Sequence, residues 1–186
     1  MKKKRNFLTI DIALTIIGGV IYGLAAFSTM NWAIGFITLR PLVFIAPLWG
    51  ILFGPWVGGL AGLIGNTFIS DILAGWFGIG GVGGAVGNFM LGFLPGLMVK
   101  NAKDWKSVIL WAVIATLICA VAVGGWIALM GYAPFLTLFT IVLIADIPPN
   151  VIILPILSYY LVDRVRRMGL YYPERKKALE EAVVEE

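Results

Sequence analysis

Three ionisable side chains lie within or at the ends of long apolar stretches: Arg40, Asp71 and Asp146. A charged group is costly in hydrocarbon, so such residues are expected to face protein or a water-filled cavity and to serve a function. A purely structural ion pair of Arg40 with one of the aspartates is the alternative. Two carboxylates and one arginine still leave a surplus negative charge. That surplus favours a neutral, zwitterionic or cationic ligand, although Arg40 could equally hold a carboxylate or phosphate.

Three asparagines accompany these charges. Asn66 precedes Asp71 by five residues, and Asn150 follows Asp146 by four. A rise of ~1.5 Å per residue places Asn88 roughly 9 Å below the outer end of its predicted helix. Buried amides need hydrogen-bond partners, and an outward-facing wet pocket would satisfy all of these groups. We therefore predict a substrate-binding site formed by Arg40, Asn66, Asp71, Asn88, Asp146 and Asn150, rimmed by Trp32, Trp76, Trp126 and Tyr132. Each aromatic residue is also typical of an interfacial belt.

The composition identifies the class of protein. Of 186 residues, 60% are hydrophobic and 13% are charged, which is too apolar for a soluble domain and predicts an all-α polytopic membrane protein. The absence of histidine and the single cysteine, Cys119, argue against a disulfide framework and the usual zinc sites. We expect no metal, no cofactor and no catalytic residues. The net charge of +4 reflects topology and does not indicate nucleic-acid binding.

Continuous apolar runs predict six transmembrane helices. The first three have approximate ranges of 7–27, 41–53 and 55–74, with a loop at 28–39. The fourth follows a glycine-rich connection at 75–84 and continues to about residue 99. The fifth spans roughly 108–130, and the sixth follows a turn at 131–134 and ends near residue 162. Pro47 is expected to break the second helix. The Pro148-Pro149 pair is expected to break the sixth helix and to leave backbone carbonyls beside Asp146 without their usual amide donors. We predict a transmembrane domain over residues 1–165 and a cytoplasmic tail over 166–186. The tail is either a short surface helix or frayed.

The basic residues predict the topology. With six spans, every lysine and arginine except Arg40 lies on one side of the membrane. The positive-inside rule then places both termini in the cytoplasm and the chain in the cell membrane.

Glycine patterns predict close helix packing. The spacing GGxxGxxGN occurs at residues 58–66 and again at 80–88. Small residues at such spacing let helix backbones approach closely in lipid. Two glycine faces that pack against each other would explain the pattern, and would hold Asn66 and Asn88 in place. Gly19 and Gly23 form a further small-residue pair, which is a docking face for a helix inside or outside this chain.

These features resemble a known family. Six short helices, basic cytoplasmic ends and an FGPxxGxxxGxxGN-like turn and helix at residues 53–66 are similar to the substrate-binding S components of energy-coupling factor (ECF) vitamin transporters. The resemblance implies a subunit that captures a small water-soluble vitamin or precursor in its outer half, without catalysis. It also implies partnership with a T component and two cytoplasmic ATPases, with Gly19 and Gly23 at the place where the T component docks.

Two other classes of protein remain open on the residues alone. A self-sufficient secondary carrier could use Asp71 or Asp146 as a proton relay. An intramembrane enzyme could use the same two carboxylates as a catalytic pair. The chain contains no P-loop, so it cannot bind ATP by that means.

Overall fold

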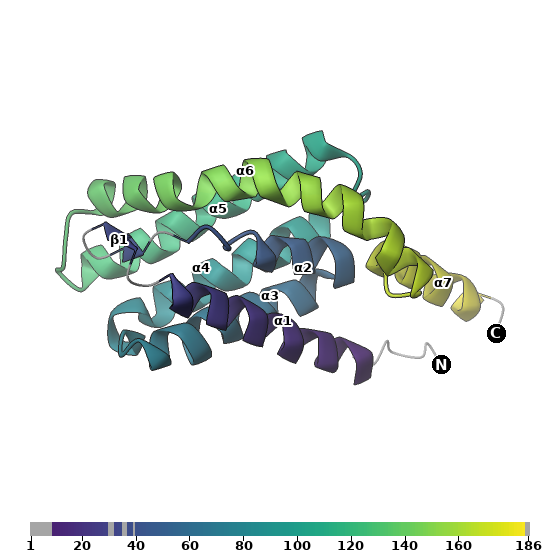
Figure 1. Ribbon diagram of the computed structural model, residues 1–186, viewed down its shortest axis with the longest axis horizontal. Helices are drawn as coiled ribbons and strands as arrows, with labels where there is room; N and C mark the ends of the chain where they lie inside the picture. Colours follow the sequence, from purple (N-terminus) through teal and green to yellow (C-terminus); the bar gives the residue numbers. More distant parts are fainter. Residues whose placement is uncertain (1–8, 30–31, 35–36, 39, 185–186) are drawn as a thin grey trace.

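The protein is a bundle of helices that run along the long axis of the molecule (Figure 1). A computed structural model describes residues 9–29, 32–34, 37–38 and 40–184. The long helices are α1 (Thr9–Ser28), α4 (Phe77–Met98), α5 (Trp105–Leu129) and α6 (Phe135–Arg167). Four helical stretches, α1, α4, α5 and the one that begins at Phe135, are long and apolar enough to cross a membrane. The chain is therefore a multi-pass membrane protein.

Two shorter helices lie among the long ones. Helices α2 (Ile45–Phe53) and α3 (Pro55–Leu63) have nine residues each, so the predicted count of six spans stays a prediction. Gly54, with a φ of 115°, makes the turn between them, and Pro55 begins α3 because its missing amide costs nothing there. Pro47 lies inside α2 and does not break it.

Helix α3 continues directly into a π-helix, η1 (Ile64–Asp71). The sequence predicts one uniform helix over residues 55–74, and the chain is indeed helical throughout most of that range. The sequence does not predict the change from α-helical to π-helical winding at Ile64. π-helical turns are rare and occur frequently at functional sites.

The segment predicted as a loop at 28–39 contains a small hairpin. Strands β1 (Ala33–Ile34) and β2 (Ile37–Thr38) pair antiparallel, with Ala33 opposite Thr38. The hairpin lies at the end of the bundle opposite the two chain termini (Figure 1). We call these the hairpin end and the basic end.

The predicted connection at 75–84 is shorter than expected. Helix α4 begins at Phe77, but it is interrupted by a kink at Gly81, whose φ of 40° and ψ of −139° suit glycine. The predicted break in the sixth helix is wrong. Helix α6 runs unbroken through Pro148 and Pro149. Neighbouring helices can support a proline inside a membrane helix, so the missing amides need not end it.

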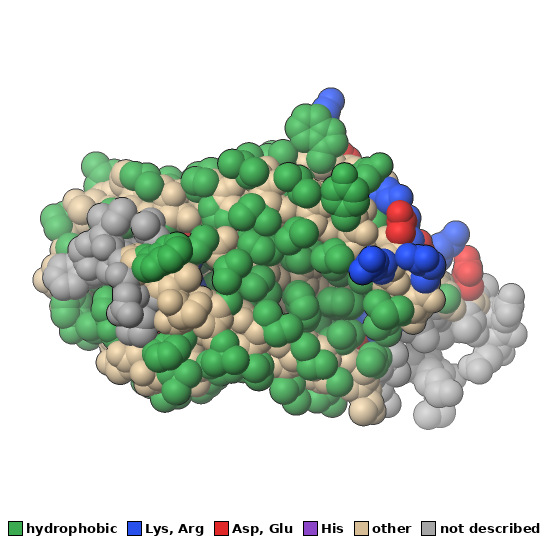
Figure 2. All heavy atoms as spheres, in the orientation of Figure 1, with side chains coloured by type: hydrophobic (Ala, Val, Ile, Leu, Met, Phe, Trp, Pro, Cys, Tyr) green, Lys and Arg blue, Asp and Glu red, His purple; other side chains and the backbone are tan. Residues whose placement is uncertain are grey.

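The basic end carries the charges. Lysine, arginine, aspartate and glutamate side chains gather there, whereas the body of the bundle is covered by hydrophobic ones (Figure 2). The predicted tail is helix α7 (Tyr172–Val184). Arg175 of α7 forms an ion pair of 2.7 Å with Asp11 of α1, and Arg166 pairs with Glu174 at 2.8 Å. Helix α7 is thus tied to the ends of other helices.

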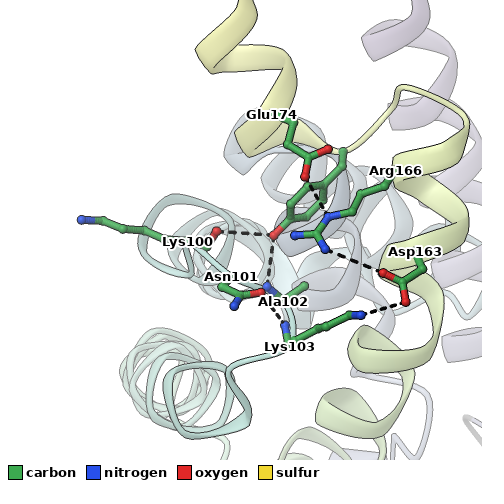
Figure 3. Close-up of polar contacts among 8 residues, drawn as sticks. Lys100, Asn101, Ala102, Lys103, Asp163, Arg166 and Glu174 are labelled. Atoms are coloured by element: carbon green, nitrogen blue, oxygen red, sulfur yellow. Dashed lines mark hydrogen bonds and ion pairs between the residues drawn. The ribbon is translucent and has the colours of Figure 1, made fainter.

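The loop between α4 and α5 joins the same network (Figure 3). The hydroxyl of Tyr171 accepts a hydrogen bond of 3.0 Å from the amide of Ala102, and Lys103 pairs with Asp163 at 2.8 Å. The guanidinium of Arg166 lies 4.9 Å from the centre of the Tyr171 ring. These contacts join the loop at residues 100–103 to the end of α6 and to Tyr171, which precedes α7.

The glycine repeats bring backbones into contact, and the predicted contact between the two copies occurs where Gly62 meets Asn88 and where Gly84 meets Asn66. A β-carbon added at Gly58 would collide with Gly50 of α2, and one added at Gly62 would collide with the carbonyl oxygen of Asn88. The first copy therefore packs on α2 and on the middle of α4. In the second copy, Gly83 and Gly87 face α5.

Gly19 and Gly23 pack against a helix of this same chain, which is one of the two possibilities that the sequence left open. Both are buried, and their faces are covered by this chain's own η1, with Ile64 beside Gly19 and Ile69 beside Gly23. A partner helix would need the same face, and docking of a T component there stays a prediction. Their order also shows that η1 runs in the same direction as α1, toward the hairpin end.

We expect Gly62→Ala to lower the free energy of unfolding by about 1–3 kcal/mol, because the new methyl group meets a backbone oxygen that cannot rotate away. Gly125→Ala is the matched control, since a β-carbon there meets nothing within 4 Å. Thermal unfolding in detergent measures both. Equal melting temperatures for the two variants would contradict backbone contact at Gly62.

Candidate functional site

A cavity of about 80 Å³ lies in the part of the bundle toward the hairpin end. Its walls come from the segment after β2, from η1, and from α4, α5 and α6. Its lining residues are Arg40, Asn66, Ser70, Asp71, Ala74, Trp76, Ile79, Gly80, Gly84, Asn88, Cys119, Val123, Ile127, Val142 and Asp146. Five of the six polar residues predicted for the site therefore share one cavity.

Arg40 is the centre of the hydrogen bonds at this site. Its Nη2 donates to the Tyr22 hydroxyl and to Asn66 Oδ1, both at 2.6 Å, and to Asn88 Oδ1 at 3.1 Å. The Tyr22 hydroxyl in turn donates to Asn88 Oδ1 at 2.6 Å. No ion pair joins Arg40 to Asp71 or Asp146, all three of which are described residues. Neutral oxygens from α1, η1 and α4 hold the guanidinium.

The π-helical winding of η1 brings Asn66 and Asp71 together. The amide nitrogen of Asn66 donates to Asp71 Oδ2 at 3.0 Å. In an α-helix, residues five apart point about 140° away from each other, so this contact would be lost. In a π-helix, where backbone hydrogen bonds join residues five apart, such residues lie closer to one face. The unusual winding therefore places both side chains on the cavity.

Glycines make room for these polar groups on the opposite wall. A β-carbon at Gly80 would collide with the carboxylate of Asp71. One at Gly84 would lie 3.2 Å from the amide nitrogen of Asn66 and 3.5 Å from Asp71. Gly80 and Gly84 of the second glycine repeat thus leave space for the side chains that line the cavity.

Asp146 reaches the cavity from α6, and Asn150 lies one turn further along. Asp146 is 2% exposed and its Oδ2 has no hydrogen-bond partner among the described residues. Asn150 does not line the cavity; its amide nitrogen donates to the Thr116 hydroxyl at 3.0 Å, and Thr116 donates to the carbonyl of Ala112. Its Oδ1 is likewise without a partner.

Three of the four aromatic residues predicted for the rim do not line the cavity. Trp32 and Tyr132 are 59% and 43% exposed. Trp126 packs against the kink at Gly81, and its buried indole nitrogen has no partner within the described part of the chain. Trp76, which begins the turn into α4, is the aromatic residue that does line the cavity.

Comparison with known proteins now identifies the family. A sequence model of the family described as "ECF-type riboflavin transporter, S component" matches residues 3–167. This chain belongs to that family. The match ends where α6 ends, so α7 lies outside it. The predicted resemblance to ECF S components is confirmed, and the family is one of transporter subunits and not of enzymes.

One curated protein matches part of this chain. A UPF0397 protein of Vibrio atlanticus is 31% identical over 103 residues, which cover 52% of this chain and 53% of the relative. The match thus spans about half the length of the curated relative. No solved structure matches this chain.

Tyr22 is a site residue that the sequence reasoning missed. It is 1% exposed and its ring lies 5.5 Å from the Arg40 guanidinium carbon. A signal was present, because a tyrosine in the middle of an apolar span needs a partner for its hydroxyl. Its location in α1, far in sequence from the polar residues of the site, concealed it.

The site contains no obvious set of metal ligands. In the residues that the structure covers, no three histidine, cysteine, aspartate or glutamate side chains come together. Its chemistry is that of hydrogen bonding to a guanidinium, carboxylates and amides.

We expect Tyr22→Phe to lower the free energy of unfolding by about 1–3 kcal/mol, because Arg40 and Asn88 each lose a buried hydrogen-bond partner. Tyr160→Phe is the control, since that side chain is 70% exposed and its change should stay within about 0.5 kcal/mol. Both are measured by thermal unfolding in detergent. A Tyr22→Phe protein as stable as the control would show that the Arg40 cluster does not support the fold.

Proposed function

We propose that this chain is the substrate-capturing subunit of an ECF-type importer, and that riboflavin is its first candidate substrate. The observation that carries the proposal is the cavity in which Arg40, Asn66, Asp71, Asn88 and Asp146 converge inside an otherwise apolar bundle. Polar groups gathered in an apolar pocket are what a small-molecule site requires. The family description supplies the vitamin, since it names riboflavin transporters.

We further propose that the basic end faces the cytoplasm and the cavity opens to the outside, in a six-span arrangement. The positive-inside rule supports this orientation, because the basic residues gather at the end that holds both termini (Figures 1 and 2). The chain would then pass its substrate inward with energy from a T component and two ATPases. Such partners would account for a transport subunit without a P-loop of its own.

The cavity must enlarge to admit a vitamin. Its 80 Å³ is well below the roughly 300–1,000 Å³ of typical ligand pockets. The segment from Gly75 to Gly81 supports a place for this opening. Both glycines have positive φ, of 71° and 40°, and Trp76, Ile79 and Gly80 between them line the cavity. We propose that this segment moves outward when substrate enters.

Two measurements test the function. Quenching of riboflavin fluorescence by the purified protein in detergent should show saturable binding. In proteoliposomes, uptake of riboflavin should require the T component and ATPases together with ATP. Uptake by this chain alone under a proton gradient would instead support a secondary carrier, and the absence of riboflavin binding by the folded protein would exclude that vitamin.

We expect Gly80→Ala to weaken riboflavin binding by about tenfold or more, because the added methyl group displaces the Asp71 carboxylate. Gly78→Ala is a matched control in the same first turn of α4, since a β-carbon there meets nothing within 4 Å. Fluorescence titration gives both dissociation constants. Equal affinities of the Gly80→Ala and Gly78→Ala proteins for riboflavin would show that Asp71 is not part of the binding site.

A further inference from the structure

Asp146 is a buried acceptor that lacks a donor. Its side chain lies on the cavity wall at 2% exposure, and its Oδ2 has no hydrogen-bond partner in the described part of the chain. A buried polar atom without a partner is uncommon in proteins and needs an explanation. For a carboxylate in this position there are three possible explanations: a bound proton, a bound cation, or a ligand that donates a hydrogen bond to it.

The two asparagines that converge around Arg40 already have hydrogen-bond partners. Asn66 accepts from Arg40 and donates to Asp71, while Asn88 accepts from Arg40 and donates to the carbonyl of Gly84. A ligand that bonded to either amide would have to replace an existing hydrogen bond. Asp146 can gain a hydrogen bond without such a loss.

The surroundings of Asp146 reinforce its need for a donor. Asn150, one turn along the same face of α6, also has a buried oxygen without a partner, and its nitrogen is occupied by Thr116. The nearest turn of α6 thus offers acceptors and no free donor. Arg40, the cation of the cavity, donates from its Nη2 to three neutral oxygens and forms no ion pair with Asp146, both being residues that the structure describes.

We propose that Asp146 recognises the substrate of the proposed function by accepting a hydrogen bond from a ring N–H of that substrate. For riboflavin this group is N3–H, the one ring N–H of the oxidised isoalloxazine. The inference rests on the proposed function and adds the atom that is recognised. A charged acceptor makes a hydrogen bond about twice as strong as a neutral one, so this contact would contribute strongly to affinity.

The test compares riboflavin with N3-methylriboflavin, in which a methyl group replaces the donor hydrogen. Three purified proteins are titrated by flavin fluorescence: the unaltered chain, Asp146→Asn and Asp163→Asn. Asp163 lies on the same helix but forms ion pairs with Lys103 and Arg166 at the basic end, so its substitution is a matched control.

The unaltered chain should bind riboflavin about 10- to 100-fold more tightly than N3-methylriboflavin. Asp146→Asn should weaken riboflavin binding and reduce that preference, and Asp163→Asn should change neither. Equal binding of the two flavins by the unaltered chain, or an undiminished preference in Asp146→Asn, would overturn the inference while the proposed function stands. If the folded chain binds neither flavin, riboflavin is not the substrate, and this inference falls with that assignment. Equal binding of the two flavins by the unaltered chain overturns the inference even if Asp146→Asn does not fold, whereas its support requires the reduced preference in a folded Asp146→Asn protein.

Discussion

One guanidinium nitrogen ties the site to the fold. Nη2 of Arg40 donates to oxygens from α1, η1 and α4, three elements that lie far apart in the sequence. Because these partners are neutral, Arg40 is held in place without direct pairing to a carboxylate. Asp71 and Asp146 therefore keep acceptor capacity on the same cavity, which a purely structural ion pair would have used. The cluster both joins the helices and leaves the site ready to bind.

The backbone packing that surrounds this cluster depends on glycine. Where α3 meets α2 and α4, an added β-carbon would strike backbone atoms at Gly58 and Gly62, so the helices touch without side chains between them. Glycine disfavours a helix in water, but close backbone contact compensates for this in lipid. Near the hairpin end the same residue type has another effect, since Gly80 and Gly84 leave space in front of Asp71. A single repeated spacing thus serves packing in one half of the bundle and the cavity in the other.

Much of this could be predicted from the sequence. Polar residues in apolar stretches must face the interior of the bundle or a water-filled cavity, because lipid cannot solvate them. The sequence could therefore assign one cavity to a set of five residues, namely Arg40, Asn66, Asp71, Asn88 and Asp146. Their roles as ligand contacts remain predictions. Hydropathy also located most helices to within a few residues, because a membrane span must be continuous and apolar.

The errors have a common physical origin in tertiary contacts. The π-helical winding of η1 and the kink at Gly81 depend on neighbours that a local pattern does not reveal. Tyr22 joins the site from a helix whose other residues gave no sign of it. Likewise, Gly19 and Gly23 could be recognised as a packing face, but only the fold shows that η1 covers it.

The central claim is that this cavity holds a vitamin, and the small molecules that copurify with the protein test it most directly. Mass spectrometry should identify one flavin-like compound, present in stoichiometric amounts, after denaturation of protein purified from its own membranes. The same compound should be strongly depleted from a folded Asp71→Asn variant. A folded protein that carries no such molecule, or an Asp71→Asn variant that retains it fully, would contradict the account.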